Sequence, residues 1–131
     1  MKNTILKYIK YIYYFSLIVL LILYLFPGSL IGYLLYGNLT LQPNWFKNPI
    51  GTSINHLIFF SYITILAMTV RLRTKNILTN YRFILFISCV LEISHLIIPN
   101  RAFEFYDLIA NFIGVVIILL LNSFIKWRKH L

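Results

Sequence analysis

The sequence predicts an all-α integral membrane protein, a four-helix bundle with both termini in the cytoplasm. Three observations predict this fold class. Hydrophobic residues make up 60% of the chain and charged residues only 11%, whereas a soluble domain carries about 25% charged residues. Four apolar segments approach the length of a membrane-spanning helix, and the basic residues gather on one side of that topology. We therefore expect a single domain over residues 1–131.

The four apolar segments are the expected transmembrane helices. Their approximate limits are 9–26, 54–70, 83–98 and 108–125. A spanning helix needs about 20 apolar residues, with a lower limit near 17, so the third segment is slightly short. The first segment follows several lysines, as the apolar part of a secretion signal does. It is longer than such a signal and no A-x-A cleavage site follows it, so we expect a retained helix.

The stretch between the first two segments contains a short apolar piece, residues 30–36. This piece is too short to span a bilayer and glycines bracket it, so we expect an interfacial or re-entrant segment. The alternative is an extension of the first helix beyond a kink at Pro27. Three aromatic residues in this stretch suit the headgroup zone: Tyr33, Tyr36 and Trp45.

The basic residues predict the orientation. Ten of the twelve lie on one side of the four-helix topology: Lys2, Lys7, Lys10, Arg71, Arg73, Lys75, Arg82, Lys126, Arg128 and Lys129. By the positive-inside rule that side is cytoplasmic. Only Lys47 and Arg101 remain on the opposite side, so the turn at residues 100–106 is expected to be extracytoplasmic. This distribution at helix ends argues against a nucleic-acid partner.

All three acidic residues of the chain, Glu92, Glu104 and Asp107, lie between positions 91 and 114. The predicted topology puts them near the extracytoplasmic surface, with Glu92 about 9 Å below it at 1.5 Å per residue. An ionisable group at the centre of a membrane helix costs about 2.5–3.5 kcal/mol and usually faces a bundle interior or a cavity. The acidic residues are therefore candidates for function, and Glu92 in particular needs a partner.

Other polar residues are expected at the same depth. His95 lies one helical turn after Glu92 on the same face, and Asn111 follows Asp107 by four residues along one stripe of the last helix. The predicted polar pocket comprises His56, Glu92, His95, Arg101, Glu104, Asp107 and Asn111. Ala110 and Gly114 form a small-x-x-x-small pair that would let a neighbouring helix approach closely.

A purely structural interpretation of this cluster is possible, in which Arg101 neutralises Glu104 or Asp107. We favour a packing role for Asn111, Ala110 and Gly114, and a functional role for Glu92 and Arg101.

Metal binding is the other interpretation that the residues raise. Glu92-x-x-His95 matches the Glu-x-x-His element of carboxylate metal bundles, which use two such elements and two further carboxylates. This chain has only one Glu-x-x-His element, so we expect no metal and no other cofactor. The alternative is a metal site in which His56 is a third ligand beside Glu92 and His95. The single cysteine, Cys89, excludes an intrachain disulfide.

The acidic stretch resembles the carboxy-terminal motif of the VanZ-like family of small membrane proteins. The residues that carry the resemblance are Glu92, His95, Pro99, Arg101, Glu104, Asp107, Asn111 and Gly114, together with Pro27, His56 and Tyr62 upstream. Two positions depart from the family pattern: His95 stands where Gln is common, and Thr52 and Ser53 stand where the family usually has Asp-Lys. The resemblance implies a cell-envelope role and, as in the family's teicoplanin-resistance member, lowered susceptibility to that lipoglycopeptide.

The expected function is binding of a membrane lipid or a lipid-linked envelope precursor in an outer-leaflet polar pocket. Two alternatives stay open. One is a membrane enzyme in which Glu92 or His95 acts as acid or base on a lipid-linked glycan and Arg101 holds a phosphate. The other is a structural subunit of an envelope or polysaccharide assembly. The sequence assigns no catalytic residue and names no protein partner.

Overall fold

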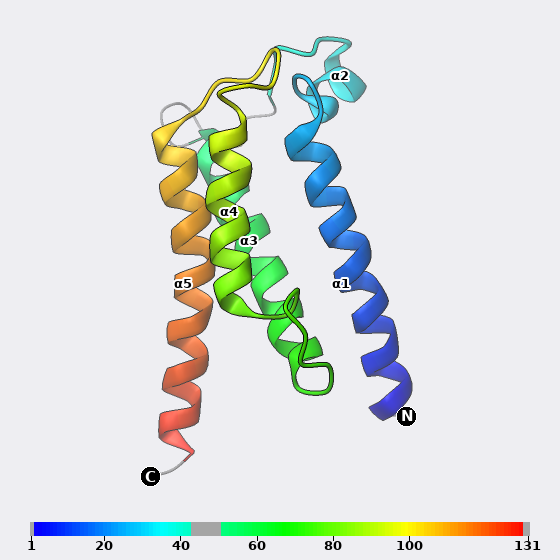
Figure 1. The fold of residues 1–131 in the computed structure, drawn as a ribbon, viewed down its shortest axis with the longest axis vertical. Helices are drawn as coiled ribbons and strands as arrows, with labels where there is room; N and C mark the ends of the chain where they lie inside the picture. Colours follow the sequence, from blue (N-terminus) through cyan, green and yellow to red (C-terminus); the bar gives the residue numbers. More distant parts are fainter. Residues whose placement is uncertain (1, 43–50, 130–131) are drawn as a thin grey trace.

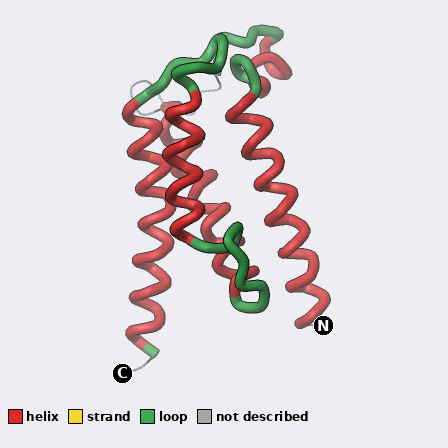
Figure 2. The backbone as a smooth tube through the Cα atoms, viewed as in Figure 1, coloured by secondary structure: helices red, strands yellow, loops and turns green. Residues whose placement is uncertain are grey.

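The computed structural model describes residues 2–42 and 51–129, and this part of the chain is all-helical. It contains five helices and no strand: α1 (Lys2–Leu25), α2 (Leu30–Tyr36), α3 (Gly51–Arg71), α4 (Tyr81–Ser94) and α5 (Phe105–Arg128) (Figures 1 and 2). The prediction of an all-α fold is confirmed. The expected positions of Trp45 and Lys47 lie outside the described residues.

Among the described residues, three helices are long and apolar enough to cross a membrane: Thr4–Leu25, Ser53–Arg71 and Phe105–Arg128. The third expected span, residues 83–98, is shorter than predicted, because α4 has 14 residues and ends at Ser94 instead of 98. A helix of this length rises only about 21 Å, against a hydrocarbon core of about 30 Å. Pro99 disfavours helical backbone in the residue before it, and Asn100 has a left-handed φ of 56°. The chain therefore turns before α4 can reach the predicted end.

Helix α3 is central to the packing, since it contacts α5, α1 and α4. The start of α1 and the end of α5 lie at the same end of the molecule, and the segments 26–42 and 95–104 lie at the other (Figure 1). The apolar core between the helices includes Tyr13, Leu20, Phe60, Ile63, Ile84, Leu91 and Val115. Many large apolar side chains of α1 and α5 are exposed on the outside.

The close pair in this packing is α3 with α5, at Gly114. A Cβ atom added to Gly114 would lie 2.6 Å from the Leu57 carbonyl oxygen and 3.2 Å from the Phe60 Cβ. The Ser61 hydroxyl donates to the Gly114 carbonyl at 3.1 Å. Ala110, one turn earlier, is also buried. At Gly114 the helices thus approach closely, and the structure identifies α3 as the partner helix there.

The short segment after α1 is a separate helix and does not extend α1. The chain leaves α1 after Leu25 and turns through Gly28, whose φ of +92° favours glycine. Ser29 then caps α2 by accepting a hydrogen bond from the Gly32 N–H at 2.9 Å, which satisfies one of the free donors of a helix start. Gly37, with a φ of +67°, ends α2.

Candidate functional site

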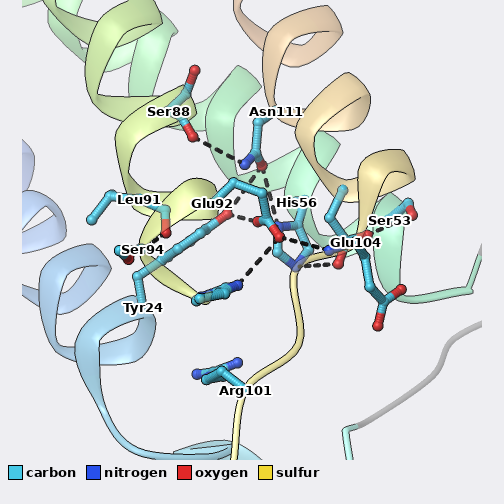
Figure 3. Close-up of polar contacts among 12 residues, drawn as sticks. Tyr24, Ser53, His56, Ser88, Leu91, Glu92, Ser94, Arg101, Glu104 and Asn111 are labelled. Atoms are coloured by element: carbon cyan, nitrogen blue, oxygen red, sulfur yellow. Dashed lines mark hydrogen bonds and ion pairs between the residues drawn. The ribbon is translucent and has the colours of Figure 1, made fainter. Parts of the chain in front are cut away.

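Polar side chains from four helices meet at the end of the molecule that holds the segments 26–42 and 95–104 (Figure 3). The group comprises Tyr24 of α1, Ser53 and His56 of α3, Glu92 of α4, His95 at its end, and Asp107 and Asn111 of α5. Five of these residues belong to the pocket predicted from the sequence. Tyr24 and Ser53 were not predicted.

Glu92 is the deepest charged group, with no exposed surface. Its Oε1 lies 3.2 Å from His95 Nδ1, and the backbone N–H of Glu104 donates to the same oxygen at 3.4 Å. Its Oε2 is buried without a hydrogen-bond partner and lies 3.7 Å from His56 Nδ1. One oxygen of this carboxylate is therefore satisfied and the other is not.

Asp107 lies in the first turn of α5, where the helix dipole favours a negative charge. The Ser53 hydroxyl donates to Asp107 Oδ1 at 2.6 Å, and His56 Nε2 lies 3.4 Å from Oδ2. Each oxygen of this carboxylate thus faces a group from α3.

His56 lies between the two carboxylates and completes a chain of polar contacts. Its Nδ1 lies 2.6 Å from the Tyr24 hydroxyl oxygen and 3.2 Å from Asn111 Oδ1. The Tyr24 hydroxyl donates to Asn111 Oδ1 at 3.0 Å, so the Tyr24 oxygen is an acceptor for a proton on His56 Nδ1. Asn111 Nδ2 donates to the Ser88 carbonyl at 3.4 Å. The network ties α1, α3, α4 and α5 together.

His95 stacks on the Tyr24 ring, with centroids 5.3 Å apart and planes at 16°. Since His95 Nδ1 faces Glu92, this nitrogen is the donor, and the buried Nε2 is left without a hydrogen-bond partner. A buried polar atom without a partner carries a desolvation cost, so its presence needs an explanation.

Arg101 has a role that the sequence did not predict. Its guanidinium donates to two carbonyl oxygens at the end of α1, Phe26 at 3.4 Å from Nε and Leu23 from Nη2. These carbonyls have no partner within their own helix. Within the described residues no acidic side chain forms an ion pair with Arg101, in contrast to the structural interpretation considered above. Burial lowers the pKa of Arg101, and the nearby Tyr24 and Glu92 act in the opposite direction.

Glu104 lies at the edge of the cluster. It is the N-cap residue of α5, its side chain is exposed, and it contributes only its backbone N–H to Glu92. Figure 3 shows its carboxylate pointing away from His56. Partial burial and the Asp107 and Glu92 charges raise the pKa of Glu104.

A cavity of about 140 Å³ adjoins the cluster. Apolar side chains of α1, α2 and α3 form one part of its wall, and polar side chains form the other. The apolar part includes Leu20, Leu23, Leu30 and Phe59, and the polar part includes His56, His95 and Arg101. A wall of this composition suits a molecule with an apolar and a polar end.

The arrangement supports two kinds of chemistry. His56 and His95 both contact a carboxylate and line the cavity, so a proton can be held beside a bound molecule. In addition, His56, Glu92 and Asp107 each offer one ligand atom, and these atoms lie within 4.8 Å of one another.

No family model, no curated protein and no solved structure matches this chain.

Proposed function

We propose that this chain is a VanZ-like, multi-pass protein of the cell membrane that binds a lipid-linked or lipid-anchored envelope molecule at its extracytoplasmic side. In this role it lowers susceptibility to teicoplanin-type lipoglycopeptides. The observation that supports the proposal is the cavity, whose wall combines apolar side chains with His56, His95 and Arg101 of the polar cluster. No catalytic step is needed for this function.

The two parts of the cavity wall match the two parts of such a molecule. Leu20, Leu23 and Phe59 provide contacts for the first carbons of a lipid chain. Arg101 uses two of its N–H donors on the carbonyls of α1. Because a guanidinium has five donors, three are left for a phosphate or carboxylate. The volume of about 140 Å³ admits the junction of head group and chain, with the rest of the lipid lying outside.

The proposed topology is a four-helix bundle with cytoplasmic termini, in which α4 is a short crossing completed by the turn after it. The shared end of α1 and α5 supports this topology, since it also carries the basic clusters near both termini (Figure 1). By the positive-inside rule the polar cluster then faces the outer leaflet.

Filling the cavity tests the binding. We expect Leu23→Trp to displace the bound molecule, because the larger side chain occupies the apolar wall. Leu21→Trp is the matched control, since Leu21 is on the same helix but 40% exposed on its outside. Native mass spectrometry of the purified chains should show a co-purified lipid or lipid-linked molecule on the wild type and on L21W, and a loss of most of it on L23W.

The same proposal is tested in cells that carry the chain. Deletion should change teicoplanin susceptibility or envelope lipid composition, and Glu92→Gln, Arg101→Ala and Asp107→Asn should each reproduce part of that change. If the deletion has a clear effect but all three variants keep the wild-type teicoplanin susceptibility and envelope lipid composition, a role for the polar cluster is contradicted. Equal lipid retention by L21W and L23W would contradict the cavity as the binding space.

A further inference from the structure

The two buried carboxylates of the polar cluster lack a full complement of positive charge. Glu92 has no exposed surface and Asp107 is 4% exposed. Across the described ranges, the ion pairs of these two residues involve only histidines, and neither pairs with a lysine or arginine. One ligand oxygen of each carboxylate lies within 4.8 Å of the other. Two buried negative charges this close repel each other and lose their hydration, so they require protons or a cation.

A proton on His56 does not satisfy the cluster. A protonated His56 donates from Nδ1 to the Tyr24 oxygen at 2.6 Å and from Nε2 toward Asp107 Oδ2 at 3.4 Å. Both N–H groups are then used, and Glu92 Oε2 still has no hydrogen-bond partner. A buried acceptor without a partner costs about 1–3 kcal/mol, and more when it is charged. A cation that contacts His56, Asp107 and Glu92 Oε2 together removes this deficit.

We propose that His56, Glu92 and Asp107 bind a divalent transition-metal ion of the Zn²⁺ class. An imidazole nitrogen beside two carboxylates favours such an ion over Mg²⁺ or Ca²⁺, which prefer oxygen ligands alone. The two carboxylate charges match the charge of the ion. His56 Nε2 is the ligand nitrogen, because Nδ1 is held by the Tyr24 hydroxyl.

The distances are close to those of a bound ion. Metal–ligand bonds of about 2.0–2.2 Å put the ligand atoms of a tetrahedral site roughly 3.4 Å apart. His56 Nε2 and Asp107 Oδ2 are already 3.4 Å apart. One ligand atom from each of His56, Glu92 and Asp107 lies within 4.8 Å of the other two, and Glu92 Oε2 lies 3.7 Å from the other nitrogen of the His56 ring, Nδ1. A rotation of the Glu92 side chain toward Nε2 would complete the site.

Groups around the three ligands orient them in the way that outer contacts do in metal sites. The Ser53 hydroxyl holds Asp107 Oδ1, and His95 Nδ1 holds Glu92 Oε1. Each carboxylate thus keeps one oxygen in a protein contact and has the other free for the ion. His56 also lines the cavity, so the ion lies beside the space assigned to the lipid. The metal site does not depend on lipid binding.

Metal binding is measured on the full-length chain in detergent, after its purification tag is removed and it is stripped with EDTA. Equilibrium dialysis followed by elemental analysis should give about one Zn²⁺ per chain. Co²⁺ should produce a visible absorption band that Zn²⁺ abolishes and that an equal concentration of Mg²⁺ does not. Glu92→Gln and Asp107→Asn should each weaken Zn²⁺ binding by more than about tenfold. Loss of a residue that only orients a ligand already weakens metal binding by about tenfold or more, and the loss of a ligand should cost at least as much.

Glu104→Gln is the matched control, since it removes a nearby acidic side chain that is exposed and outside the ligand set. It should bind Zn²⁺ like the wild type. An equal loss of binding in E104Q would point to nonspecific charge and overturn the proposal. If a ligand variant fails to fold, the test rests on the wild type, whose melting temperature Zn²⁺ should raise. A wild type that binds no stoichiometric Zn²⁺ and whose melting temperature does not change would overturn the proposal.

Discussion

At the residue scale, Tyr24 organises the site. Its hydroxyl contacts both His56 and Asn111, and its ring stacks on His95. The sequence gives no signal for this role, because Tyr24 is one of ten tyrosines and many of them are exposed. By contrast, the Glu92–His95 contact follows from a spacing of three residues in one helix. Spacing within a helix can be read from a sequence, whereas the faces that different helices turn toward each other cannot.

Removal of the Tyr24 hydroxyl is expected to destabilise the protein. Tyr24→Phe leaves the buried Asn111 Oδ1 and the His56 ring with one contact fewer, which costs about 1–3 kcal/mol. Tyr8→Phe is the control, because Tyr8 is on the same helix and 64% exposed; its effect should stay within about 0.5 kcal/mol. Reversible unfolding in detergent, followed by circular dichroism, measures both. Equal stability of the two variants would show that the Tyr24 network contributes nothing.

At the element scale, the sequence predicted the existence of the helices better than their ends and contacts. The small residues of α5 predicted a close helix contact, but only the structure shows that α3 approaches Gly114. The end of α4 was placed too late, because an apolar run through Ile98 conceals the effect of Pro99 on the backbone. The structural alternative for Arg101, a pair with Glu104 or Asp107, is not what the structure shows: its guanidinium donates to carbonyl oxygens at the end of α1.

A methyl group at Gly114 should force α3 and α5 apart. Gly114→Ala places an atom 2.6 Å from a backbone oxygen of α3, and a backbone cannot move aside as a flexible side chain can. Overpacking of this kind costs about 1–3 kcal/mol. Ser123→Ala, at an exposed position later on α5, is the control and should change little. The same unfolding measurement compares them, and an unchanged stability for G114A would contradict the close contact.

At the scale of the whole molecule, the apolar and polar surfaces are arranged as lipid requires. Large apolar side chains cover the outside, for example Phe15 at 67% exposed and Leu120 at 64%. The buried charged groups gather inside one end. Such a distribution is costly in water and favourable in a bilayer, where ionisable groups face the bundle interior.

The orientation of this arrangement is tested by cysteine labelling. In a Cys89→Ser background, Ala102→Cys puts a thiol in the turn after α4, and Lys75→Cys puts one in the link between α3 and α4. Both positions are exposed. A membrane-impermeant maleimide added to intact cells should label the first, and the second only after permeabilisation. The reverse pattern would place the polar cluster on the cytoplasmic side.

The contact between Arg101 and α1 has a consequence for the order of assembly. Arg101 follows Leu23 by 78 residues and Phe26 by 75. During synthesis, α1 is therefore complete long before the group that satisfies its last carbonyls exists. Until then those carbonyls require water or lipid head groups, which keeps the end of α1 at the membrane surface. We therefore expect the contacts that complete the end of α1 to form only after the turn before α5 has been made.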